Sequence, residues 1–124
     1  MDTPEPTNIG LSELAHTRLR RLKEDGHFGE MVDAYRVAVA LALASGVQPP
    51  ELPGTRSNIF NVGTVDPDRE LYTAIKTLLS TGDIPVYRWA ERLAEWGVTE
   101  LFRRSELGLN ISDLLLEAGP LSQE

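Results

Sequence analysis

The side chains that most often carry chemistry are sparse in this chain. It has no cysteine, so it offers no thiolate nucleophile, no thiolate metal ligand and no disulfide framework. Its two histidines, His16 and His27, form neither an H-x-x-x-H nor an H-E-x-x-H motif. We expect His16 to face solvent and His27 to lie in a turn. The chain is therefore predicted to hold no metal.

Asp66 and Asp68 alternate with other residues in the way that the acids of a calcium-binding loop do. Leu71 and Thr77, however, occupy the positions where such a loop needs glycine and glutamate. Helix capping explains the acids better, because Asp66 is a good N-cap and Pro67 suits a first helical position. The sequence contains neither a glycine pattern for binding nucleotides nor a recognisable Ser/His/Asp grouping. We predict no catalytic residue, no cofactor and no enzymatic activity.

Charge gives the first indication of a binding function. The net charge of −7 counts against non-specific binding to nucleic acid, which depends on lysine and arginine displacing counterions from phosphates. Residues 13–23 nevertheless carry four basic side chains and a single acidic one, Glu13. The basic residues are Arg18, Arg20, Arg21 and Lys23. Two interpretations stay open for them: a solvated helix face, which is favoured, or a surface that contacts DNA phosphates.

Trp89 and Trp96 lie on one predicted helical face with Leu93 between them. Exposed tryptophans could stack on bases, but packing in the core is the favoured interpretation. In the segment 55–65 neither a helical nor a strand period is clean. We expect that segment to be extended, anchored by Phe60, with small polar residues such as Asn61 satisfying its backbone.

The stretch 31–45 is the one that the other elements must cover. From Val37 to Ala44 it contains no polar residue, so as a helix it would have no polar face. Large side chains alternate with alanine there, which would also suit a strand. The four alanines and the stop at Gly46 favour a helix. We therefore predict a central helix that is buried on all sides.

Caps and glycines divide the rest of the chain into further helices. Ser12 and Gly26 delimit the first, and it forms a tight hairpin with the central helix. The predicted later helices are 67–80, 86–97 with Gly97 as its end, 100–107 capped by Thr99, and a short one near 111–118. A ribbon–helix–helix arrangement with residues 7–11 as its strand is discounted, because that stretch has no Lys, Arg or Gln to read bases.

These observations predict a mainly all-α protein, a bundle of five to six short helices around a central buried helix. We expect one extended segment near 55–65. The predicted organisation is a mobile tail at 1–8, a helical domain at 9–119 and a C-terminal tail at 120–124. Apolar runs are shorter than the roughly 20 residues of a membrane span, and residues 1–8 show no secretory signal. We expect a cytoplasmic protein that does not contact membranes.

The order of residues also resembles the small DndE-type proteins of bacterial DNA sulfur modification, over about residues 11–115. The most specific match is the Phe-Asn-x-x-Thr segment that begins at Phe60. The other matching positions are Leu11-Ser12, Ala15, Leu19, Leu22-Lys23, Gly26, Arg36, Ala38, Gly54, Leu71, Leu78, Leu79, Leu101-Phe102-Arg103, Gly108 and Leu114.

This resemblance implies a compact helical component of a phosphorothioation system. Such a component is non-catalytic, binds DNA with a preference for nicked duplex, and assembles as an oligomer that uses surface lysines. The present chain departs from that pattern, because it is acidic and its only lysines are Lys23 and Lys76. The DNA-contact candidates are Arg18, Arg20, Arg21, Lys23 and Arg36.

The leading hypothesis is an accessory subunit of a DNA modification or phage-defence complex, which binds duplex DNA weakly or together with other subunits. A homo-oligomer is expected. The alternative is an acidic protein–protein adaptor that never contacts DNA.

Overall fold

The chain folds into five helices and a two-stranded antiparallel sheet over residues 4–108, the part that the computed structural model describes. The elements are β1 (Asn8–Ser12), α1 (Glu13–Glu24), α2 (Met31–Ser45), β2 (Arg56–Asn61), α3 (Val62–Val65), α4 (Glu70–Leu78) and α5 (Val86–Glu106). Helices account for 58% of the structure, which confirms the prediction of a mainly helical fold. The fold is not purely α, because two segments far apart in the sequence pair as strands.

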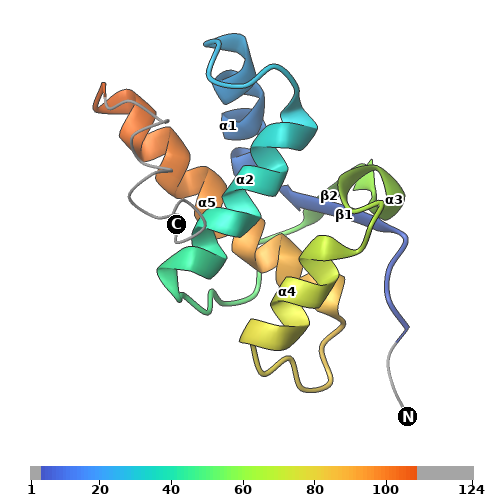
Figure 1. The fold of residues 1–124 in the computed structure, drawn as a ribbon. Helices are drawn as coiled ribbons and strands as arrows, with labels where there is room; N and C mark the ends of the chain where they lie inside the picture. Colours follow the sequence, from blue (N-terminus) through green and yellow to red (C-terminus); the bar gives the residue numbers. More distant parts are fainter. Residues whose placement is uncertain (1–3, 109–124) are drawn as a thin grey trace.

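Helices α2 and α5 make the most extensive contact in the molecule and cross at its centre (Figure 1). Helix α2 has the predicted bounds and ends at Gly46, whose left-handed φ of 73° favours glycine. Tyr35 and Val39 of this helix are fully buried. Ala40 and Ala44, however, are exposed. The prediction of burial on all sides is therefore wrong, since the neighbouring elements leave one alanine stripe of α2 in contact with solvent.

Gly97 does not end a helix, as the sequence had suggested, but lies inside the single long helix α5. A Cβ atom on Gly97 would lie 2.1 Å from the carbonyl oxygen of Ala38 in α2. The glycine therefore lets the two backbones touch where the helices cross. Thr99 is not a cap, because its hydroxyl donates to the carbonyl oxygen of Glu95 within the same helix.

The predicted extended segment at 55–65 is a strand only as far as Asn61, and α3 follows directly. β2 pairs with β1, with Ile9 opposite Phe60, and a bulge follows between Ile9 and Gly10. The stretch that was discounted as a DNA-reading ribbon is thus a strand, but its partner lies in the same chain. The tail predicted at 1–8 is also corrected in its described part, because Asn8 begins β1 and Glu5 accepts hydrogen bonds from α5.

The second edge of β1 lies against α5 rather than another strand. The N–H groups of Gly10 and Ser12 donate to the carboxylates of Glu91 and Glu95, each at 3.0 Å. Tyr35 donates its hydroxyl to the Gly10 carbonyl oxygen, also at 3.0 Å. Two glutamates one helical turn apart therefore satisfy alternate N–H groups of a strand edge. This arrangement closes part of an edge that could otherwise pair with another chain.

Asp66 caps α4, but from further away than predicted. The helix begins at Glu70 instead of residue 67, so Pro67 lies in the preceding turn. The Asp66 carboxylate accepts the N–H groups of Leu71 and Tyr72, each at 2.9 Å. The carboxylate reaches across this turn to the start of α4, and Asp66 itself is buried at 5% exposure. The helix predicted near 111–118 and the C-terminal boundaries of the domain lie outside the described residues.

Candidate functional site

The five basic residues proposed for DNA contact do not form one group in the structure. Arg36 lies on α2 and contacts the C-terminal end of α3. Its Nε and Nη2 donate to the carbonyl oxygens of Val65 and Thr64, each at 2.8 Å, and its Nη1 lies 3.0 Å from the Asp33 carboxylate. The carbonyl groups at a helix C-terminus lack partners within the helix, so the guanidinium satisfies them. Arg36 therefore has a structural role and is not positioned as a free phosphate contact.

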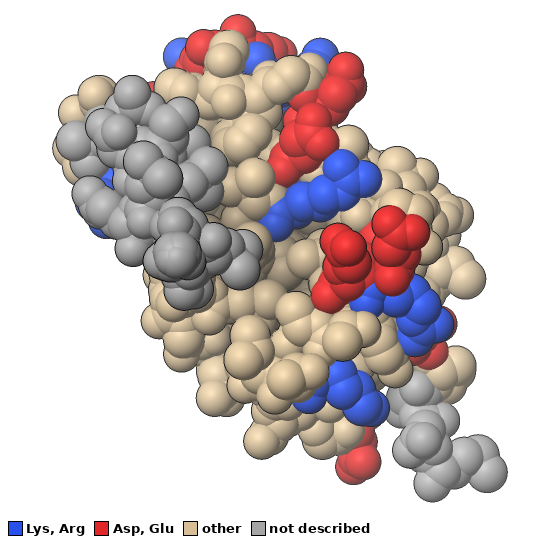
Figure 2. All heavy atoms as spheres, in the orientation of Figure 1, with Lys and Arg blue, Asp and Glu red and all other residues tan. Residues whose placement is uncertain are grey.

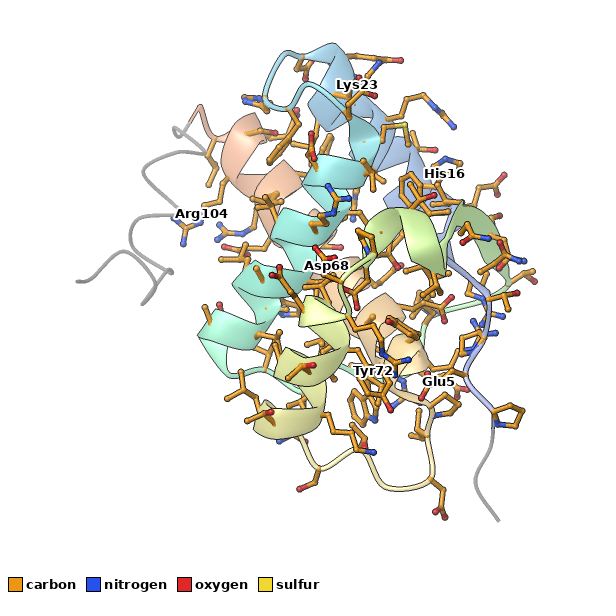
Figure 3. All side chains as sticks on the ribbon, turned by 45° about the vertical axis from the view of Figure 1, so that its right-hand side comes forward. Glu5, His16, Lys23, Asp68, Tyr72 and Arg104 are labelled. Atoms are coloured by element: carbon orange, nitrogen blue, oxygen red, sulfur yellow. The ribbon has the colours of Figure 1, made fainter. Side chains whose placement is uncertain are left out.

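The other four candidates lie on α1 and differ in their contacts. Arg21 pairs with Asp25 at 3.2 Å, and the Arg18 guanidinium lies 5.4 Å from the centre of the Phe102 ring. Arg20 and Lys23 are exposed and form no ion pair with any residue of the range 4–108. Figure 3 shows Lys23 near the end of α1 at the top of the molecule. Arg20 and Lys23 are thus the fully exposed basic residues of this surface without an ion pair, while Arg18, which also forms none among the described residues, is half-buried.

Acidic side chains accompany this basic surface. Glu13, Glu24 and Asp25 belong to or directly follow α1 and are exposed. On the face shown in Figure 2, basic and acidic side chains are interspersed and no broad area of one sign is present. A surface of this kind generates only a weak field beyond the Debye length of about 8 Å at physiological salt.

The aromatic residues singled out in the sequence have structural roles. Trp89 is 8% exposed and donates its indole N–H to the carbonyl oxygen of Thr81, and Trp96 packs partly buried against the core. Trp89 therefore packs in the core as predicted, whereas Trp96 lies at its edge. Phe60 meets Tyr35 edge to face at 5.4 Å, and the Asn61 side chain caps α3 by accepting the Gly63 N–H.

Neither histidine lies in a ligand cluster. His16 is half-buried on α1, where burial and the neighbouring Arg20 lower its pKa below the usual 6.5. His27 is exposed in the turn after α1, as predicted. Within residues 4–108 there is no group of three or more His, Cys, Asp or Glu side chains that could hold a metal ion.

A pocket of about 610 Å³, which the sequence did not indicate, lies between the loop that precedes β2 and the first half of α5. Three arginines line it: Arg56 at the start of β2, and Arg88 and Arg92 one turn apart on α5. Glu91 lies at its base and Glu51 at the loop side. The sequence signal was the Arg88-Trp-Ala-Glu-Arg92 run, but Arg56 joins it only through the fold.

Glu91 organises this pocket and is 2% exposed. Its Oε2 accepts from Arg88 Nη1 at 2.8 Å and from the Gly10 N–H at 3.0 Å, and lies 3.1 Å from Arg56 Nε. Burial raises the pKa of Glu91 above the usual 4.5, while Arg88, Gly10 and Arg56 oppose that rise. A buried carboxylate is retained at low cost only when it is paired and hydrogen-bonded, which is the case here.

Arg92 completes the pocket without an ion pair. Its guanidinium lies 4.7 Å from the centre of the Trp89 ring, a cation–π contact that fixes its orientation. The Arg92 guanidinium forms no hydrogen bond to another described residue, whereas Nε of Arg56 is paired with Glu91 at 3.1 Å. Arg92, with the remaining N–H groups of Arg56 and Arg88, is available to an anionic group.

Comparison with known proteins gives no relative: no family model, no curated protein and no solved structure matches the chain. Between residues 4 and 108, no helix has both the length and the apolar character needed to cross a membrane.

Proposed function

We propose that this protein is a non-catalytic accessory subunit of a DNA modification or phage-defence system, and that it contacts DNA phosphates through α1 within a complex. The observation that carries the proposal is the pair Arg20 and Lys23, which is exposed on α1 and free of ion pairs within the described structure. The resemblance to DndE-type proteins supports the same class of function. It also supports a cytoplasmic location and assembly with further copies or other subunits.

A single copy of this surface can bind DNA only weakly. Arg36 is committed to α3, and Arg21 is partly neutralised by Asp25. Each phosphate contact contributes a slope of about −0.9 to the dependence of log affinity on log salt, so two to four contacts give weak and salt-sensitive binding. Self-association would gather several α1 helices on one duplex and multiply these contacts. We therefore expect retention of duplex DNA to depend on protein concentration.

The two lysines of the chain provide a matched test. Lys23 and Lys76 are both exposed, both lie in the last turn of a helix, and neither forms an ion pair among the described residues. Lys23→Glu and Lys76→Glu therefore change the net charge and the helix-end electrostatics equally. In gel shifts with intact and nicked duplex at about 50 mM salt, we expect Lys23→Glu to abolish retention and Lys76→Glu to preserve it. Equal effects of the two changes would refute a contact through α1.

The net charge of −7 favours a second candidate, an acidic adaptor that docks on a basic partner protein. The interspersed acidic side chains of Figure 2 fit this role as well as they fit a weak DNA contact. Absence of any shift by the parent protein, at high protein concentration and low salt, would favour the adaptor. Co-purification from the native host would then identify the partner.

A further inference from the structure

We propose that the pocket lined by Arg56, Arg88 and Arg92 binds a small anionic ligand that carries a phosphate or carboxylate group and a small apolar group. This ligand site lies on different elements from the α1 surface, and its existence does not depend on the proposed contact with DNA. The pocket has a volume of about 610 Å³, which falls within the range of about 300–1,000 Å³ typical of small-molecule sites.

The charges of the pocket favour an anion. Three guanidinium groups line it against the carboxylates of Glu51 and Glu91. Glu91 is buried, and its Oε2 is paired with both Arg56 and Arg88. The side chains of these two arginines remain 35% and 30% exposed, so both can reach a ligand while part of their surface is shielded from water. Partial shielding strengthens the attraction between a guanidinium and an oxyanion relative to open solvent.

The arginines are also held in place before a ligand arrives. Arg88 and Arg56 are held by their contacts with Glu91, and Arg92 is held by its cation–π contact with Trp89. A guanidinium that is already oriented loses less conformational entropy when it binds an oxyanion, often through two parallel hydrogen bonds. The arrangement thus provides donors from two elements, β2 and α5, directed at one space.

The rest of the lining indicates what else the ligand carries. Leu52, Ile84 and Pro85 add a smaller apolar part to a lining that is otherwise mainly polar. The N-terminus of α5 is not an alternative anion site, because Glu5 accepts the N–H groups of Val86 and Tyr87 at 2.8 and 3.0 Å. Phosphate monoesters and carboxylates with a small apolar group match both the guanidinium groups and this apolar part of the lining.

The test uses phenyl phosphate, benzoate and inorganic phosphate as probes, titrated into the full-length protein and followed by amide chemical shifts. We expect saturable binding of phenyl phosphate or benzoate, with shifts at β2 and the first half of α5, and weaker binding of inorganic phosphate, which lacks the apolar group. Tighter binding of phenyl phosphate identifies a phosphate site, and tighter binding of benzoate identifies a carboxylate site.

The decisive variant is Arg92→Gln, which removes one guanidinium that forms no ion pair in the described structure. Its matched control is Arg69→Gln, because the Arg69 guanidinium also lies over an aromatic ring, at 4.1 Å from the centre of Tyr72, but outside the pocket. We expect Arg92→Gln to weaken probe binding about tenfold and Arg69→Gln to leave it unchanged. Absence of saturable binding by either organic probe, or equal weakening by both variants, would overturn the proposal.

Lys23→Glu should leave probe binding intact. Failure of the proposed DNA contact and failure of this ligand site can therefore be told apart.

Discussion

Replacing Gly97 with alanine tests the contact on which the core depends. The added Cβ would lie 2.1 Å from the Ala38 carbonyl oxygen and 2.5 and 2.6 Å from its carbonyl carbon and Cα. All three are backbone atoms of α2, so no side chain can move aside. Ordinary van der Waals contact begins near 3.4 Å. The two helices would therefore have to separate by about 1 Å, which loosens packing along their whole interface.

The expected cost follows from two opposing effects. Overpacking of a tight core costs about 1–3 kcal/mol, and this site belongs at the upper end because the clash involves backbone atoms. Alanine in a helix interior recovers about 1 kcal/mol relative to glycine. We expect Gly97→Ala to lower the free energy of unfolding by about 2 kcal/mol, and the melting temperature by roughly 8 °C.

Thermal and denaturant unfolding followed by circular dichroism would measure this loss. The matched control is Gly29→Ala, because Gly29 has open space where its Cβ would lie. That change should be neutral or stabilise the protein by up to about 1 kcal/mol through the unfolded state. If Gly97→Ala were as stable as Gly29→Ala, α2 and α5 could not cross at the separation described here. Helix α5 would then be free to end at residue 97, as the sequence had suggested.

Two further changes test buried carboxylates. Asp66→Ala removes the cap of α4 and the acceptor of the buried Tyr87 hydroxyl at 2.8 Å, so we expect denaturant unfolding to show a loss of about 2–4 kcal/mol. The exposed Asp68→Ala should stay within about 0.5 kcal/mol of the parent protein, and a comparable loss there would contradict the capping argument. Burial raises the folded pKa of Glu91 above 4.5, so folding takes up a proton between the two pKa values. The stabilising contribution of Glu91 is therefore present in full below pH 4.5 and is lost as pH rises through the folded pKa. Unfolding measured between about pH 4 and pH 8 should show this fall for the parent protein relative to Glu91→Gln, and a difference that rises with pH would refute it.

Local patterns were enough to predict α1 and α2. Ser12 accepts the N–H of Ala15 as the predicted cap, and the stops at Gly26 and Gly46 both adopt left-handed φ values. These features depend on residues within a few positions of one another. The apolar period of each helix likewise indicates its buried side without knowledge of its neighbours.

The tertiary structure decided what the same kinds of residue do elsewhere. Gly97 carries the same sequence signal as Gly46, but the close approach of Ala38 makes it part of a helix crossing instead of a stop. Residues 8–12 show no clear strand pattern, and they become a strand because β2 pairs with one edge and Glu91 and Glu95 satisfy the other.

The candidate sites follow the same division. The charges of α1 were visible in the sequence, since neighbouring residues of one helix share a surface. The sequence did not show that Arg36 binds the carbonyl groups of α3, or that Arg56 lies beside Arg88 and Arg92. Both arrangements bring together residues from separate elements. Arg36, for example, is 28 and 29 positions away from the residues whose carbonyl groups it binds. Sequence periodicity indicates which side of a helix or strand is buried. Which side chains from other elements contact that side is decided only when the chain folds.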